Sequence, residues 1–486
     1  MTVSSAFSRW GFRFLVALAA TLLAWLAVPG IGYCQVSMDP PAAGVAMRNC
    51  LDCHRRPNLE STEGVRSNQA LCLECHAKKE CTRQVDGRQV PLRVDLKSFQ
   101  GSRHQMVACL QCHQDVARSP HRTEAGAQCS SCHGPHGEAT VKAPHLRVSC
   151  AACHHRGKAL AFEAKRGQVV LSRFDDHQRP IGLADHTAPG LGQDVLCQRC
   201  HHPGNQVGAA AMVLPAKGVI CFLCHNASFS IGSPWFGLAL IIMIIGLVLM
   251  ARFWFQGSVA GGEGSLHQKI ADGSETVWRT IFSRRVVGVL KVIFFDVLLQ
   301  RRLLKESVRR WFFHSLVFLS IMLRLGMSLF TWLVYHVWPQ GSLAAALIDK
   351  NHPFTAMFND LTGLCILLGI VLAMVQRLVG PKHVKSEGQD TLALVIIGLM
   401  VVAGFVAEGA RILMTQVDPQ TAVYSFVGYP LSRLWARFSL DWQGIYGYLW
   451  YAHALLAALF VAYLPFGKMR HMFTTPLSLL INRDLQ

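Results

Sequence analysis

The sequence predicts a mostly α-helical and irregular chain in two parts, an exported cysteine-rich domain followed by a five-helix transmembrane bundle. Three observations predict this. Of the 486 residues, 51% are hydrophobic and only 16% are charged, a composition typical of membrane proteins. Fourteen of the 17 cysteines belong to copies of one short motif in the first half of the chain. Apolar runs that are long enough to span a membrane begin only after Ser233.

Residues 1–34 have the pattern of a secretory signal. Arg9 and Arg13 precede a 15-residue apolar run from Phe14 to Val28, and small residues follow it. The run is shorter than the roughly 20 residues that a spanning helix needs. An N-terminal anchor that is not cleaved is the alternative interpretation. In either case the following segment is expected to be exported.

Residues 35–229 cannot form an ordinary hydrophobic core. This segment has no Trp or Tyr and few Phe, and it is rich in Gly, Ala, His and Cys. With so little large apolar surface, it should be disordered unless something other than protein fills its interior.

The motif C-x-x-C-H occurs seven times in this segment. Two thiols three residues apart can bond both vinyl-derived carbons of one haem, while the imidazole of the next residue reaches the iron. Redox-active C-x-x-C pairs or zinc sites are the competing interpretations, and they are disfavoured because all seven copies end in His. We therefore predict a periplasmic domain packed around seven covalent haems c, with about 28 residues per macrocycle. The expected thioether cysteines are Cys50, Cys53, Cys72, Cys75, Cys109, Cys112, Cys129, Cys132, Cys150, Cys153, Cys197, Cys200, Cys221 and Cys224, and the expected proximal ligands are His54, His76, His113, His133, His154, His201 and His225.

Eight further histidines are candidates for the second axial ligand of these irons. His104 and His145 each precede a motif by five residues, and His155 and His202 directly follow a motif histidine. The other four, for which a surface position is the alternative, are His121, His136, His177 and His186. Because two histidines fill both axial positions, the pattern favours electron transfer over periplasmic catalysis.

The first two motifs have no spare histidine near them in the sequence. The second ligands of their irons would then come from distant residues, from Met47 or Met106, or from the thiolate of Cys81. A small buried thiol is the alternative interpretation of Cys81.

Five apolar runs are long enough to span a membrane. They cover residues 235–251, 312–335, 354–376, 391–414 and 445–466. The connecting segments on one side hold 17 Lys and Arg against three on the other, which places the first side and the C-terminus in the cytoplasm. This topology accounts for the formal charge of +18 better than binding of nucleic acid does.

The stretch Val286–Leu299 is also apolar, but it is shorter and Lys291 and Asp296 interrupt it. It predicts an interfacial amphipathic helix rather than a sixth span.

Three histidines of the membrane half predict a second redox centre. His453 and His471 are 18 residues apart, which is five turns of a continuous helix, so both would lie on one face about 27 Å apart. His314, at the cytoplasmic start of the second span, would be level with His471. Histidines inside a membrane are costly and usually functional, and stacked ones suit haem b. Ordinary interfacial histidines are the alternative.

The run from Trp450 to Asn482, with His453, Pro465, Lys468 and His471, resembles the cytochrome b family of respiratory nitrate reductase gamma subunits. It is more similar still to membrane subunits of heterodisulfide reductase and of the transmembrane redox complexes of sulfate reducers. The likeness covers about residues 230–486. It implies one or two haems b, electron exchange with menaquinone or ubiquinone, and a cytoplasmic iron-sulfur partner.

One position departs from this family. Where nitrate reductase gamma subunits have a second histidine, this chain has Arg324, so the ligand opposite His453 is open. His336 and His352 are the candidates at the right membrane face. Arg324 itself would bind a haem propionate or pair with Glu408.

Quinone chemistry needs a group that accepts protons beside a haem. Glu408, Asp360 and Arg411 are the polar candidates, and Gly404 with Glu408 and Arg411 also matches the family pattern. Glu408 and Arg411 are one helical turn apart and could instead pair with each other.

The resulting expectation is a multi-pass protein of a bacterial inner membrane that carries electrons between the quinone pool and periplasmic c-type cytochromes. The seventh motif ends about ten residues before the first span, so its haem is expected to rest at the membrane surface as the relay. A conduit that docks an iron-sulfur protein on its cytoplasmic face, and a periplasmic multihaem reductase, are the alternatives.

Overall fold

The structure, a computed structural model, describes residues 59, 61–85, 88–113, 143–154, 160–165, 167–172, 197–227, 230–254, scattered positions between 264 and 283, and residues 285–339, 341–379 and 388–481. Several predicted features lie outside these residues. They are the expected signal segment, the motifs of Cys50, Cys53 and His54 and of Cys129, Cys132 and His133, and the candidate ligands His121, His136, His155, His177 and His186.

The described residues of the cysteine-rich half form short elements. Among them are the helices α3 (Thr62–His76), α4 (Leu96–Gln100), α5 (Cys109–Cys112) and α6 (Cys150–His154), with 3-10 turns η1 (Arg103–Met106), η4 (Ala143–Arg147) and η6 (Val219–Cys221). Strands β1 (Thr82–Val85) and β2 (Arg88–Pro91) form one antiparallel hairpin, and β3 (Leu160–Glu163) and β4 (Gln168–Leu171) form another.

Motif cysteines coincide with the helical turns of this half. The second motif ends α3, and α5 and α6 begin at the first cysteine of their motifs. Helix α3 begins where the side chain of Ser61 accepts a hydrogen bond from the backbone N–H of Gly64 at 3.0 Å, an N-cap. The helical turn brings two cysteines three residues apart onto one side of the chain.

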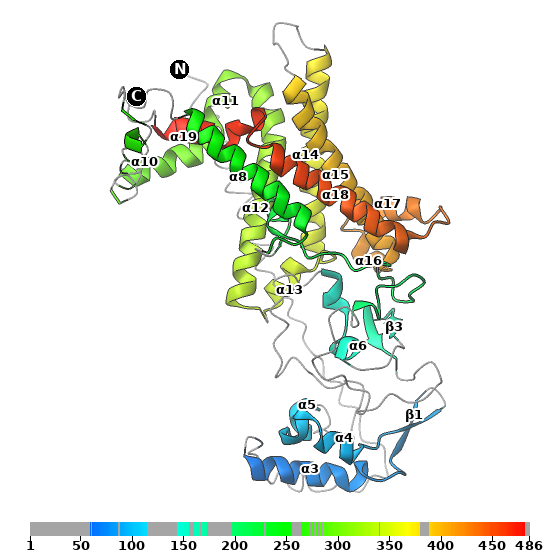
Figure 1. Cartoon of the computed structure of the whole chain (residues 1–486). Coiled ribbons are helices and arrows are strands. Elements are labelled where there is room, and N and C mark those ends of the chain that lie inside the picture. The colour runs from blue at the N-terminus through cyan, green and yellow to red at the C-terminus, as the bar shows by residue number, and fades with distance from the viewer. Residues whose placement is uncertain are drawn as a thin grey trace, which may run out of the picture.

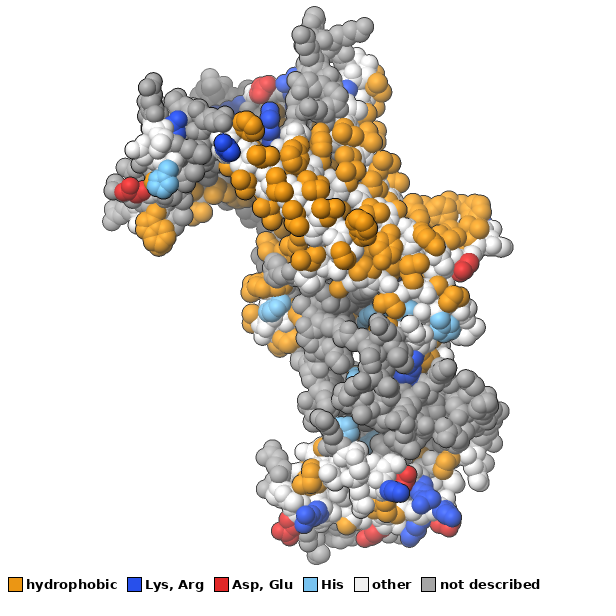
Figure 2. Space-filling view, in the orientation of Figure 1, with side chains coloured by type: hydrophobic (Ala, Val, Ile, Leu, Met, Phe, Trp, Pro, Cys, Tyr) orange, Lys and Arg blue, Asp and Glu red, His pale blue; other side chains and the backbone are white. Residues whose placement is uncertain are grey.

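Among the residues that the structure describes, five helices of the second half are long and apolar enough to cross a membrane, as predicted. They are α8 (Pro234–Trp254), α12 (Val308–Val337), α14 (Pro353–Val379), α15 (Gly388–Met414) and α18 (Trp442–Tyr463). Figure 2 shows hydrophobic side chains spread over the outside of this bundle, where a soluble protein would carry charges. The centre of the bundle is packed with side chains of α14, α15 and α18, among them Ile366, Ile397 and Phe460.

Short helices close the two ends of the bundle (Figure 1). The outer end, which faces the cysteine-rich half, carries α13 (Ser342–Ile348), α16 (Pro419–Ala422) and α17 (Gly428–Trp435). The inner end carries α10 (Arg285–Lys291), the π-helix η7 (Val292–Leu298), α11 (Arg301–Glu306) and α19 (His471–Ile481). The stretch Val286–Leu299 is thus helical and is not one of the spans.

The prediction of one continuous helix from His453 to His471 is wrong. Helix α18 ends at Tyr463, a turn containing Pro465 and Gly467 follows, and η8 (Lys468–Arg470) leads into α19, whose first residue is His471. Proline lacks the N–H that the helix would need, which is the physical reason for the break. The two histidines therefore belong to different helices.

Candidate haem ligand pairs

His314 and His471 lie next to each other at the inner end of the bundle. Their ring centroids are 6.1 Å apart and the ring planes differ by 57°. Two imidazoles that each bind one metal ion through a bond of about 2 Å have ring centroids about 6 Å apart, so this spacing fits two axial ligands of one iron.

A hydrogen bond fixes the orientation of His314. Its Nδ1 donates to Oε1 of Gln300 at 2.9 Å, which leaves Nε2 to face His471. Metal-binding histidines usually donate their second ring N–H in this way, which sets the tautomer. Gln300 is buried and adopts a left-handed backbone conformation, with φ of 52°, at the junction of η7 and α11.

A second pair, which we call the outer pair, lies deeper in the bundle, near the middle of α18. The ring of His453 on α18 faces that of His225, with centroids 6.0 Å apart and planes at 62°. Nδ1 of His453 donates to the backbone carbonyl of Met400 on α15 at 2.9 Å. His225 is the last residue of the seventh C-x-x-C-H motif, so this pair joins the two halves of the chain.

A third pair lies within the cysteine-rich half. His145 and His201 have ring centroids 6.1 Å apart with planes at 77°, and Nδ1 of His201 donates to the carbonyl of Ala210 at 2.9 Å. His201 ends the sixth motif, and His145 is one of the expected distal candidates. Sequence reasoning named both residues but could not pair them.

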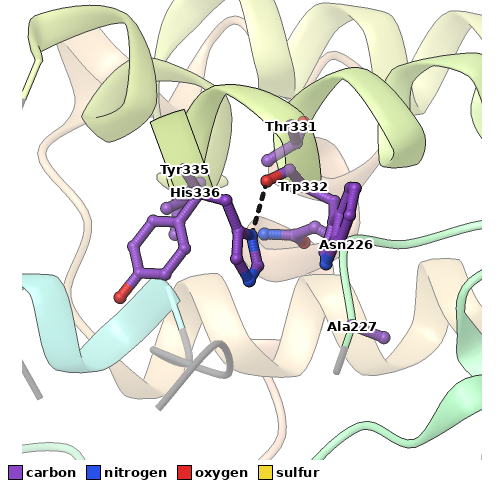
Figure 3. A pocket seen from close by; sticks show the side chains of 7 residues that line it. Asn226, Ala227, Thr331, Trp332, Tyr335 and His336 are labelled. Atoms are coloured by element: carbon purple, nitrogen blue, oxygen red, sulfur yellow. Dashed lines mark hydrogen bonds between the residues drawn. The ribbon is translucent and has the colours of Figure 1, made fainter. Parts of the chain in front are cut away.

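The histidines proposed as partners of His453 lie elsewhere. Nδ1 of His336 donates back to the carbonyl of Trp332 on its own helix at 2.8 Å, and the ring packs on Trp332 (Figure 3). His352 precedes α14, and its Nδ1 is buried without a hydrogen-bond partner among the residues that the structure describes. The ring contact of His453 is with His225.

Cys81 lies on the side of His76 that points away from an iron. Its sulfur is 3.8 Å from Nδ1 of His76, and this nitrogen also donates to the carbonyl of Leu92 at 2.9 Å. An iron would bind Nε2 on the opposite side of the ring. Cys81 is thus not positioned as the sixth ligand of the haem that His76 would hold.

Two further candidate ligands of the cysteine-rich half lie in turns. His104 belongs to η1, and Nδ1 of His202 donates to the carbonyl of Pro203 at 3.0 Å. The sulfurs of Cys72 and Cys109 lie next to each other. The second and third motifs therefore adjoin.

Polar groups gather inside the outer part of the bundle. The fully buried Asp360 accepts hydrogen bonds from the backbone N–H groups of Val427 at 2.6 Å and Gly428 at 3.3 Å. The carboxyl group of Glu408 also lies beside Gly428, and it is 3.8 Å from Arg411. Two neighbouring carboxylates repel each other inside a membrane, and a proton on one of them relieves this repulsion, so the pair can take up and release a proton.

The hydrogen bonds of Arg324 go to residues other than Glu408. Its guanidinium donates to Oγ1 of Thr362 at 2.8 Å and to the backbone carbonyl of Asn359. It also lines a hollow with Cys224 and His225. Of the two predicted roles of Arg324, contact with a haem propionate therefore fits its position better than an ion pair with Glu408.

Comparisons with known proteins assign relatives to the C-terminal half. Residues 327–486, which contain His453 and His471, match the family described as nitrate reductase gamma subunit. One subunit of the dihydromethanophenazine:CoB--CoM heterodisulfide reductase of Methanosarcina acetivorans is 26% identical over 262 residues, covering 51% of this chain and 89% of that protein. The corresponding protein of Methanosarcina thermophila is 27% identical over 263 residues, with the same coverage of both chains.

A third relative is the EtfAB:quinone oxidoreductase of Syntrophomonas wolfei, 28% identical over 140 residues, which are 26% of this chain and 19% of that protein. No solved structure matches. The C-terminal half is thus similar to membrane subunits of redox complexes, which supports a cytochrome b-type subunit that transfers electrons in a membrane.

Proposed function

We propose that this chain carries electrons across a bacterial inner membrane between the quinone pool and the c haems of a periplasmic domain. The observation that supports this most directly is the placement of two histidine pairs at two different depths of one helical bundle. His314 and His471 form the inner pair, and His225 and His453 form the outer pair. Because His225 belongs to a C-x-x-C-H motif, the route continues directly into the cysteine-rich half.

The donor set of each pair fits a haem. Both pairs have the ring spacing of two axial ligands, and one ring of each pair is fixed through Nδ1. A haem held there supplies a one-electron carrier with no open side for substrate. This argues for conduction rather than for a periplasmic reductase.

The seven C-x-x-C-H motifs are proposed to hold seven covalent haems c, and residues 35–229 are proposed to be the periplasmic domain that they fill. Residues 230–486 are proposed to be the membrane domain, with the C-terminus in the cytoplasm. The pairing of His145 with His201 supports two-histidine ligation for the haem of the sixth motif.

The carboxyl pair is proposed to handle the protons of the quinone. Oxidation of a quinol releases two protons and two electrons, whereas a haem accepts one electron and no proton. Asp360 and Glu408 both lie beside Gly428 in the outer part of the bundle, and Arg411 lies beside Glu408. Glu408 is the less buried of the two carboxyl groups, so it is the one that a quinol would meet first.

A second candidate function is a conduit to a cytoplasmic iron-sulfur partner. The relative from heterodisulfide reductase is by its name one part of a larger enzyme. The inner end of the bundle also carries Arg301 and Arg302, about half exposed although both contact Asp296. Copurification of an iron-sulfur protein that shields these arginines would favour this function.

Reduction by a quinol tests the first proposal. We expect menaquinol to reduce both b and c haems of the purified chain in lipid nanodiscs, as read from their separate α bands. Glu408→Gln should slow this reduction by about 100-fold, the order of a general-base effect, with the dithionite-reduced spectrum unchanged. Glu306→Gln, at an exposed position of α11, is the matched control. If dithionite reduces the haems and menaquinol does not, the quinone proposal is wrong.

A further inference from the structure

We propose that the outer haem of the bundle is the covalent haem of the seventh motif, bound through Cys221 and Cys224 and ligated by His225 and His453. The chain would then hold seven haems c and a single haem b, at His314 and His471. This inference deepens the proposed function and rests on it.

The ring geometry is the first argument. His225 and His453 are 228 residues apart in sequence, yet their ring centroids are 6.0 Å apart, within 0.1 Å of the 6.1 Å in each of the other two pairs. A spacing of about 6 Å is what two imidazoles on one metal ion require. The two rings cannot serve a haem c at His225 and a separate haem b at His453 unless one of the two histidines moves.

The seventh motif is packed on the membrane helix itself. Ile220 of η6 forms one buried cluster with Phe236 of α8 and with Ala454, Ala458 and Val461 of α18, and Cys221 packs against this cluster. Ala454 is the neighbour of His453 in the sequence. The motif therefore cannot swing away with the rest of the cysteine-rich half without exposing this apolar contact.

The seventh motif lines a hollow in the wall of the bundle. Cys224 and His225 line it together with Arg324 and Thr331 of α12 and Phe358 of α14. Asn226, the next residue of the chain, lines the adjoining pocket shown in Figure 3. The motif cysteine and the wall of the bundle thus face the same space.

Positively charged side chains at this hollow favour a ligand with two negative charges. Lys350 and Arg324 line the hollow, and the side chain of Lys217 lies beside that of Lys350. Burial lowers the pKa of Lys217. A haem carries two propionates, which would neutralise two of these cations.

Ligation of one haem by His225 and His453 also explains why this chain has Arg324 where the related family has a histidine. In the family that the sequence resembles, a histidine stands at this position of the second span. Here the arginine cannot bind iron, and His225 brings the missing imidazole from outside the bundle, attached to its own haem. Arg324 then contacts the propionates.

The covalent step balances without an oxidant or a reductant. The S–H of each cysteine adds across one vinyl group of haem, so that a carbon–sulfur bond forms, the vinyl double bond becomes single, and the thiol hydrogen goes to the terminal carbon. No electron leaves the iron or the thiols.

Counting haems in the purified full-length protein tests the inference. Pyridine haemochrome spectra, with acid-acetone extraction to remove non-covalent haem, should give seven haems c and one haem b. Mass spectrometry should find haem attached to the peptide that contains Cys221 and Cys224. Two extractable haems per chain, or a seventh motif without haem, would overturn the inference.

A ligand exchange identifies the residues. His453→Met should leave the counts of covalent and extractable haem unchanged and should introduce the near-infrared charge-transfer band of one His/Met haem c. His336→Met and His352→Met, at the two alternative positions, should not introduce this band. Loss of an extractable haem in His453→Met would show instead that His453 holds a haem b.

The two proposals can fail separately. If menaquinol reduces a protein that has two extractable haems, the proposed function is supported and this inference is wrong. If the protein has one extractable haem and menaquinol does not reduce it, this inference is supported and the proposed function is wrong.

Discussion

At the scale of single residues, the candidate ligands are oriented by their second ring nitrogen. Nδ1 donates to an amide or carbonyl oxygen in His314, His453 and His201, at 2.9 Å in each case. Each of these bonds fixes one tautomer and one ring orientation, so Nε2 is presented without rearrangement. The acceptors Met400 and Ala210 are backbone groups, which side-chain substitution does not remove.

Gly404 tests how tightly His453 is held. A Cβ at this position would lie 3.2 Å from Cε1 of His453, closer than ordinary contact, so Gly404→Ala should press on the ring and cost about 1–3 kcal/mol of stability. Gly398→Ala on the same helix meets Ile370 at 3.8 Å and should gain up to about 1 kcal/mol from helix propensity. We expect the melting temperatures of the two variants to shift in opposite directions, and a new low-spin paramagnetic resonance signal of the outer haem only in Gly404→Ala. Identical spectra and melting in the two variants would contradict a tightly packed ring.

At the scale of elements, the inner pair depends on two interruptions. The turn after α18 starts a new helix at His471, and the junction of η7 and α11 turns at Gln300, whose side chain reaches His314. Asp296 of η7 is buried and accepts from Nε of Arg301 at 3.0 Å, which holds this junction closed. The ligand pair is thus assembled from helix ends rather than from one helix face.

Gln300→Asn tests the junction. Asparagine tolerates the left-handed conformation, but its shorter side chain loses the hydrogen bond from His314, worth about 1 kcal/mol. A less basic His314 stabilises ferric iron less, so the midpoint potential of haem b should rise in redox titration. Gln416→Asn, at the other left-handed glutamine with φ of 47°, should leave it unchanged. Equal potentials in the two variants would show that Gln300 does not tune this haem.

The sequence predicted the elements better than their contacts. The five spans could be predicted because apolar length is a local property, and each predicted run falls on one long helix. The break before His471 was missed because the 18-residue spacing was treated as a continuous helix, although Pro465 lies between the two histidines. The contact of His225 with His453 depends on how η6 docks on α18, which no local pattern encodes.

At the scale of the whole molecule, a segment that we call the strap, residues 205–218, ties the cysteine-rich half to the outer end of the bundle. The side chain of Gln443 at the start of α18 donates to the carbonyl of Asn205 at 2.9 Å, and its backbone carbonyl accepts from the N–H of Ala211 at 3.0 Å. Ala210 and Leu214 of the strap are buried against Met414 at the end of α15. In the proposed route, electrons that cross between the halves would pass next to these contacts.

Gly208 is the point where the strap comes closest to the bundle. Its φ is +68°, and a Cβ there would collide with the backbone carbonyl of Met414. Gly208→Ala should therefore cost about 1–2 kcal/mol for the left-handed conformation and a further 1–3 kcal/mol, roughly, for the collision, lifting the strap from α15. Gly204→Ala is the matched control, because Gly204 has φ of +71° but nothing lies within 4 Å of a Cβ placed there.

Because electron tunnelling slows steeply with distance, rapid-mixing spectroscopy should find slower electron transfer from haem b to the c haems in Gly208→Ala than in Gly204→Ala. Equal rates would mean that the position of the strap does not control passage between the two halves.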